Sequence, residues 1–145
     1  MCGIVGFTGA DQAAPILLDG LAKLEYRGYD SAGLAVQNAA GKIEVVKAKG
    51  RLRVLSDMTD GGRAVQGTCG IGHTRWATHG EPSVQNAHPH YSRDEKIAVV
   101  HNGIIENYQE LKDRLVNRGY TFTSQTDTEV VAQLIDYYYT GEAAG

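Results

Sequence analysis

The second residue of the chain, Cys2, is the first candidate for chemistry because only Met1 precedes it. Removal of Met1 would leave a free α-amine, with a reference pKa of about 7.7–8.0, beside a thiol with a reference pKa of about 8.5. One residue can then supply both a nucleophile and its own general base. The alternative is that Cys2 is a small apolar residue of a strand, as free cysteines often are. With Met1 retained, the amine is locked in a peptide bond, and we expect that form to be inactive.

A second group of polar residues occupies positions 73–80, where a predicted strand at 69–75 gives way to a loop at 76–95. Arg75 can bind a carboxylate through two parallel hydrogen bonds. Trp76, the only tryptophan, lies in this polar loop rather than in an apolar stripe. A long ordered loop is often functional. The alternative is a solvated loop anchored by one aromatic residue.

Two further candidates lie at the ends of predicted elements. Asn102 and Gly103 follow an apolar strand predicted at 97–101. An Asn-Gly pair is most often a turn, but the side-chain amide and the glycine N–H can also form an oxyanion hole. Asp127 lies at the start of a predicted helix, where its carboxylate complements the helix dipole or binds an ammonium group.

A concentration of histidines raises the question of a metal site. Four of them fall within 18 positions, namely His73, His79, His88 and His90. Their spacing matches no standard zinc pattern, and no nearby Glu or Cys completes a ligand set. The glycines at 3–6 and 70–72 do not have the spacing of a phosphate-binding loop. We therefore expect no metal and no other cofactor.

Apolar periodicity predicts the elements that must position these residues. We expect strands at 4–8, 34–37, 42–49, 69–75, 97–101 and 120–123, and helices at 11–24, 107–118 and 126–138. Asn107 with Glu110, and Thr126 with Glu129, have the spacing of capping boxes, and Gly119 provides a helix stop. In the last helix the predicted apolar positions are Val130, Val131, Leu134, Ile135 and Tyr138. Together these elements predict an α/β or α+β domain in which strands outnumber helices.

Length and composition limit the class of protein. A chain of 145 residues predicts one domain, and 42% hydrophobic with 21% charged residues argues against disorder. A net charge of −3 predicts no nucleic-acid partner. No apolar run suits a membrane span, and two cysteines, Cys2 and Cys69, predict a cytoplasmic protein without a disulfide scaffold. We expect Cys69 to be an inert structural thiol. Glycine is in excess, at 18 residues.

Taken together, these motifs resemble the N-terminal glutaminase domain of the glutamine–fructose-6-phosphate aminotransferase (glucosamine-6-phosphate synthase) family, a branch of the class II, or Ntn, glutamine amidotransferases. The matching stretches follow the family order along nearly the whole chain, at residues 2–6, 24–33, 73–80, 86–90, 101–107, 119–122 and 126–129. Relatives that make phosphoribosylamine or asparagine share the leading Cys-Gly-Ile and an Asn-Gly, but not usually the runs at 26–31 and 102–107.

The resemblance implies an α+β fold, the four-layer αββα sandwich of Ntn hydrolases with antiparallel sheets. It implies that Cys2 attacks the side-chain amide of L-glutamine, giving a γ-glutamyl thioester and ammonia, and that water then releases glutamate. It assigns the oxyanion to Asn102 and Gly103 and places Arg27 near the reacting centre. The implied glutamine-binding residues are Arg75 for the α-carboxylate, Asp127 for the α-amine, Thr78, His79 and Gly103, with Trp76 on a loop that closes over glutamine. The glycine excess would then reflect close backbone approach around a small ligand.

In that family the glutaminase domain continues beyond the position of residue 145 and is followed by sugar isomerase domains, which install the ammonia on fructose 6-phosphate. We therefore interpret residues 1–145 as the N-terminal part of a glutaminase domain, and we do not expect this chain to make glucosamine 6-phosphate by itself. Sheet edges left unpaired in such a chain could join two copies into a homodimer. Two other hypotheses are a non-catalytic glutamine-binding module and a metal-dependent hydrolase built on the histidines.

Overall fold

The computed structural model describes residues 2–77 and 80–139, without the side chain of Arg27. Along the chain these residues form β1 (Gly3–Thr8), α1 (Ala13–Ala22), the short 3-10 helix η1 (Glu25–Arg27), β2 (Ser31–Gln37), β3 (Ile43–Lys49), α2 (Leu52–Met58), β4 (Cys69–Arg75), β5 (His90–Tyr91), β6 (Ala98–Val99), α3 (Tyr108–Asn117) and α4 (Thr128–Tyr138).

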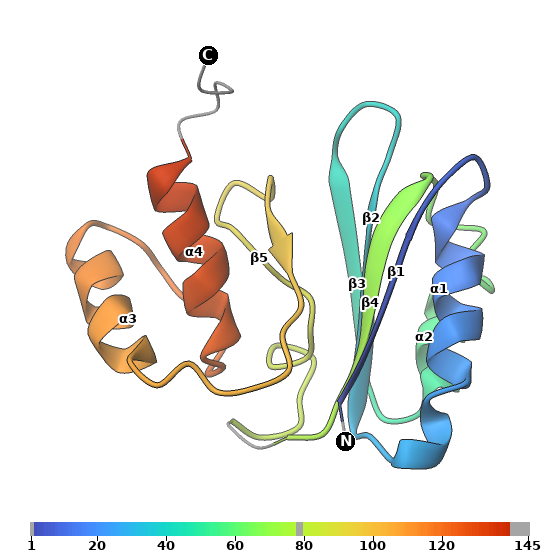
Figure 1. The fold of residues 1–145 in the computed structure, drawn as a ribbon, viewed down its shortest axis with the longest axis horizontal. Coiled ribbons are helices and arrows are strands. Elements are labelled where there is room, and N and C mark those ends of the chain that lie inside the picture. The colour runs from blue at the N-terminus through green and yellow to red at the C-terminus, as the bar shows by residue number, and fades with distance from the viewer. Residues whose placement is uncertain (1, 78–79, 140–145) are drawn as a thin grey trace.

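Both sheets are antiparallel. The larger has the strand order β1-β4-β2-β3, and the smaller pairs β5 with β6. Figure 1 shows α1 and α2 against one face of the larger sheet, with β5, α4 and α3 following in turn on the other side. The layers therefore run helix, sheet, sheet, helix, which confirms the expected α+β sandwich, although the second sheet has only two strands within the described residues.

The core between α1, α2 and the larger sheet is apolar. The helix predicted at 11–24 is confirmed as α1, whose Leu17, Leu18 and Leu21 are buried against residues of β2. Glycines of β4 allow the close approach: a Cβ on Gly72 would lie 3.1 Å from Cδ1 of Leu21, and one on Gly70 only 2.9 Å from Cδ1 of Leu17. These glycines therefore make room for a helix and not for a ligand. The expectation that the glycine excess reflects close approach around a small ligand is wrong for these two positions.

The outer helices α3 and α4 have a smaller apolar core of their own, formed by Leu115, Tyr120 and Val130. Gly119 ends α3 as predicted. It has a φ of 92°, and its N–H and that of Tyr120 donate to the carbonyls of Val116 and Leu115, both at 3.0 Å. These two bonds form a Schellman motif.

Several local predictions about α3 and α4 are wrong. Neither helix has a side-chain hydrogen bond at its N-cap; Glu110 instead accepts a hydrogen bond from Arg114 at 2.8 Å. The buried face of α4 includes Glu129 and Gln133, whereas Ile135 and Tyr138 are exposed. The predicted apolar positions are therefore confirmed at Val130 and Leu134, which pack in the smaller core, and wrong at Ile135 and Tyr138, because α4 also buries polar side chains.

The predicted strand at 120–123 is also wrong. The N–H groups of Thr123 and Ser124 donate to the buried carboxylate of Glu129, at 3.0 and 2.7 Å for the shorter bond of each. A side chain thus takes the place of a neighbouring strand as the acceptor for these two N–H groups.

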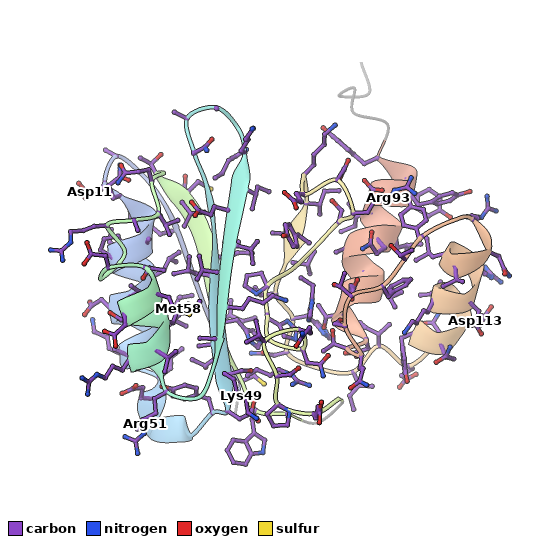
Figure 2. The ribbon with its side chains drawn as sticks, turned by 180° about the vertical axis from the view of Figure 1, so that it is seen from behind. Asp11, Lys49, Arg51, Met58, Arg93 and Asp113 are labelled. Carbon is purple, nitrogen blue, oxygen red and sulfur yellow. The ribbon has the colours of Figure 1, made fainter. Side chains whose placement is uncertain are left out.

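Many charged side chains project from the outer surfaces. Figure 2 shows Arg51 and Asp113 projecting from opposite sides of the molecule, and Arg93 beside α4, where it lies 3.5 Å from the Asp136 carboxylate. Of the helices in the described part of the chain, none combines the length and the apolar character needed to cross a membrane.

Candidate functional site

The candidate site lies at the end of the larger sheet where β1 begins and β4 finishes. The pairing of these strands places Gly3 opposite Thr74, and the Gly3 N–H donates to Oγ1 of Thr74 at 3.1 Å. A side chain at position 3 would bring a Cβ within 2.5 Å of Cδ1 of Leu24. Glycine therefore allows the beginning of the chain to lie close against β4.

The sulfur of Cys2 lies against the backbone of Trp76, directly beyond β4. The Trp76 N–H donates to Sγ at 3.3 Å, and the thiol is 3.7 Å from the Trp76 carbonyl oxygen. A backbone N–H aimed at sulfur stabilises negative charge on it. The Trp76 side chain is half-exposed, with its ring beside Gly28, so the residue closes one side of the site while its backbone holds the sulfur.

Arg75, the last residue of β4, is buried, and its guanidinium holds the loop that follows. Nη1 donates to the carbonyl of Glu81 at 3.2 Å, and Nη2 donates to the carbonyl of Gly80 at 3.1 Å. A carboxylate that binds this guanidinium must share or replace these contacts.

The sequence reasoning assigned no role to Asp30, which anchors the same loop from the start of β2. Its Oδ2 accepts the N–H of Ala77 at 2.6 Å, and its own N–H donates to the Arg75 carbonyl at 2.8 Å. Its second oxygen, Oδ1, is buried without a hydrogen-bond partner among the described residues. The only signal in the sequence was the position of Asp30 within the matching stretch at 24–33.

Asn102 contacts β4 directly, through His73. Its Oδ1 lies 2.7 Å from Nε2 of His73, and His73 is paired with Ile4 of β1. Gly103 has a φ of 147°, and a Cβ there would lie 3.1 Å from the ring of His101. The Asn-Gly pair is thus held beside the same end of the sheet as Cys2 and Arg75.

Asp127, immediately before α4, is buried, and its Oδ2 accepts the N–H of Ile105 at 2.6 Å. This bond ties the segment after Gly103 to the start of the helix. Cys2, Arg75 and Asn102 therefore all lie on β4 or contact β4 or the residue after it, whereas Asp127 is bonded to the segment after Gly103. Thr78, His79 and Met1 lie outside the described residues, as does the side chain of Arg27.

Three of the four clustered histidines form a buried column between the sheets. The rings of His73 and His88 are stacked at 4.1 Å, and those of His88 and His90 meet edge to face at 4.7 Å. Burial lowers the pKa of His73 to about 4 and also lowers the pKa of His88 and His90. Within residues 2–77 and 80–139, no three His, Cys, Asp or Glu side chains are arranged to hold a metal ion.

Two hollows flank the site. One, of about 420 Å³, is lined by Phe122 and by polar residues of 81–86 and 123–125, including Glu81 and Gln125. The other, of about 290 Å³, lies beside Gly28 and is lined by Glu25, Tyr29 and Arg51. The first adjoins both the Arg75 loop and the segment that leads to Asp127.

The fold and this arrangement define the class of the domain. Residues 59–144 match the family model described as "Glutamine amidotransferase domain". The chain therefore belongs to the glutamine amidotransferase domain family.

The sequence is similar to named relatives within that class. It is 62% identical over 142 residues to the glutamine–fructose-6-phosphate aminotransferase [isomerizing] of Caldanaerobacter subterraneus subsp. tengcongensis, and 56% identical over 142 residues to that of Thermus thermophilus. Each match covers 98% of this chain and 23% of the relative, so the chain spans about a quarter of the length of these proteins.

Solved structures agree with this placement. Glutamine phosphoribosylpyrophosphate amidotransferase from B. subtilis, complexed with ADP and GMP, superposes with a TM-score of 0.76 at 31% identity, over 94% of this chain and 29% of that one. A second structure, described as the allosteric regulatory enzyme of purine biosynthesis, gives a TM-score of 0.75 at 32% identity, over the same shares of the two chains.

Proposed function

We propose that this chain, once Met1 is removed, hydrolyses the side-chain amide of L-glutamine to glutamate and ammonia with Cys2 as the nucleophile. The observation that carries the proposal is the position of Sγ, 3.3 Å from the Trp76 nitrogen. That contact lies at the end of the same strand that carries Arg75 and contacts Asn102.

In the proposed reaction the α-amine of Cys2 takes the Sγ proton while sulfur bonds to the carboxamide carbon of glutamine. The carbonyl oxygen becomes an oxyanion, which the Asn102 side-chain NH₂ and the Gly103 N–H stabilise. The ammonium then returns its proton to the amide nitrogen, the carbon–nitrogen bond breaks, and ammonia leaves. A water, deprotonated by the same amine, attacks the thioester, and the thiol is restored as glutamate is released.

The substrate-binding roles are proposed residue by residue. Arg75 would take the α-carboxylate, because its guanidinium carries five N–H donors in a planar fork, and the carboxylate would share or replace the loop carbonyls that it now holds. Asp127 would take the α-amine, since its Oδ2 is committed to Ile105 and its other oxygen can face the ligand. Thr78, His79 and Gly103 would complete the pocket, Arg27 would lie near the reacting centre, and the Trp76 loop would close over it.

The relatives named as isomerizing aminotransferases suggest where the ammonia goes. We propose that residues 1–145 are part of a glutaminase domain whose ammonia, in proteins of that length, converts fructose 6-phosphate to glucosamine 6-phosphate. This chain would carry only the glutaminase half of that reaction.

The test is ammonia release from glutamine by protein whose Met1 loss has been verified by intact mass. We expect turnover in the processed protein, and none in Cys2→Ala or in protein that retains Met1. A Cys69→Ala variant is the matched control, because Cys69 lies at the far end of β4, and it should keep full activity. Full activity in Cys2→Ala would overturn the proposal.

A non-catalytic glutamine-binding module is the second candidate. It would need the side chains proposed to bind glutamine, such as Arg75 and Asp127, but no free α-amine on Cys2. Calorimetry with glutamine separates the two functions, because tight binding without ammonia release from processed protein would support the binding module.

A further inference from the structure

The buried histidine column has no role in the mechanism proposed above. His73 is completely buried, and His88 and His90 are no more than 5% exposed. Imidazole rings are polar, and burying them is costly unless their nitrogens are bonded. Nδ1 of both His73 and His88 nevertheless lacks a partner among the described residues. The other ring nitrogen of His73 leads to the site, where Nε2 lies 2.7 Å from Oδ1 of Asn102.

The direction of that bond determines the orientation of the Asn102 amide. An amide carbonyl oxygen can only accept a hydrogen bond, so Nε2 of His73 carries the proton. The NH₂ group of the same side chain then points away from His73. Asn102 is exposed, and within residues 2–77 and 80–139 the hydrogen bonds of its side chain use the carbonyl oxygen alone. The NH₂ group is therefore presented to the open side of the site.

The rest of the column holds the His73 ring in place. Its ring is stacked on His88 with an interplanar angle of 18°. Gly33, the partner of His73 in β2, makes this possible, because a Cβ there would collide with the His88 carbonyl oxygen. At the other end, Nε2 of His90 lies 2.7 Å from Oγ1 of Thr126, directly before Asp127. The column therefore spans from Asn102 to the start of α4.

We propose that His73 is a positioning residue for oxyanion stabilisation, because its Nε2–H donation to Asn102 aims the amide NH₂ at the carbonyl oxygen of the glutamine side chain. The inference rests on the proposed glutaminase function. Burial keeps the ring neutral at physiological pH, with a pKa of about 4, so a single proton is held on one nitrogen. Without that donor the amide can turn over and present its oxygen to the oxyanion, which repels it.

The test compares kcat and KM for glutamine in Met1-processed variants. His73→Phe keeps an aromatic ring for the stack but loses the donor, and we expect kcat to fall roughly 10- to 100-fold, a part of what a whole oxyanion donor contributes. KM should change little, because the groups that bind the α-carboxylate and α-amine remain. His73→Gln returns an N–H at a similar reach and should restore most of kcat.

The matched control is His88→Phe, which has the same change of ring in the same stack without a contact to Asn102. It should keep kcat within about threefold of the wild type, since only packing is altered. Wild-type kcat in His73→Phe, or equal losses of kcat in both phenylalanine variants, would overturn the inference.

A third variant and the wild type complete the test. If His73→Phe does not fold, His73→Asn decides, because its amide is too short to reach Asn102 and should show the same loss of kcat; wild-type kcat there would contradict the inference. Failure of the wild-type protein to release ammonia would instead overturn the proposed function.

Discussion

The two faces of the larger sheet pack against two buried layers of different character. Against α1 and α2 it buries aliphatic side chains such as Leu21, Leu34 and Val36. Against the second layer it buries His73, His88, His90, Asn86 and Glu129. The same strand serves both, because alternate residues of β4 point to opposite faces: Gly72 packs on Leu21, and His73 contacts Asn102.

This difference indicates that the two faces of the sheet have different roles. The apolar face gains stability from burial and needs no particular bonding direction. The polar face is stable only where donors and acceptors meet, and those directional bonds fix side chains in place. The hydrogen bonds described above for Asn102, Arg75 and Asp127 lie on or beside the polar face. Variants on the two faces should therefore separate stability from activity.

The largest effect on stability is expected in the apolar interior. Leu21 is fully buried, and Leu21→Ala should lower the free energy of unfolding by about 2–5 kcal/mol, from lost burial and the cavity left behind. Urea unfolding measures the loss. Glutaminase turnover per folded molecule should be unchanged. A fall in kcat at saturating glutamine would contradict the proposal that the apolar face contributes to stability and not to activity.

The largest effect on turnover is expected at the polar face. Asn102→Ala removes one proposed oxyanion donor and should lower kcat about 10²- to 10³-fold, or about 3–4 kcal/mol in the barrier. Its melting temperature should fall only modestly, because the variant loses a single hydrogen bond, the one to the buried His73 ring. A large loss of stability with unchanged kcat would place Asn102 in the structure and not in the chemistry.

The two interiors also differ in how well the sequence predicts them. The helix that became α1 and the Gly119 stop agree with the sequence predictions, because burial of aliphatic residues and a left-handed φ leave local patterns. The polar interior leaves none. Glu129 was predicted as a capping residue, and its actual bonds to Thr123 and Ser124 replaced a predicted strand.

The candidate site was predicted in part for the same reason. Cys2 and Arg75 were singled out because of their chemistry and their places beside predicted strands. The bond between His73 and Asn102 joins residues 29 positions apart, and Asp30 bonds to a residue 47 positions away. Spacing along the chain carries no trace of such contacts.

Acid should lower the stability of the fold through its polar interior, where the buried histidines lie. The pKa of His73 is about 4 in the folded protein and 6.5 ordinarily, so between these values the unfolded chain binds more protons. Stability therefore falls as pH drops from about 6.5 to 4, by about 3 kcal/mol for this residue alone. His88 and His90 act in the same direction.

Urea midpoints measured at pH 7.5, 6 and 5 check this prediction. The decline of the urea midpoint should be shallower in His73→Phe, which has no imidazole to protonate at this position. A wild-type midpoint that stays constant down to pH 5 would show that these rings are not held neutral by the fold.

The smallest expected effect compares one carboxylate from each environment. Glu129 is buried and accepts bonds from the backbone and hydroxyl of Ser124, at 2.7 and 2.6 Å. Glu129→Gln turns one of its oxygens into a donor that faces other donors, which should cost about 1–3 kcal/mol. Glu110→Gln on α3 is the matched control, because its bond to Arg114 is exposed and exposed pairs contribute about 0–1 kcal/mol. Equal losses in urea unfolding would mean that the polar interior is no more dependent on directed bonds than the surface is.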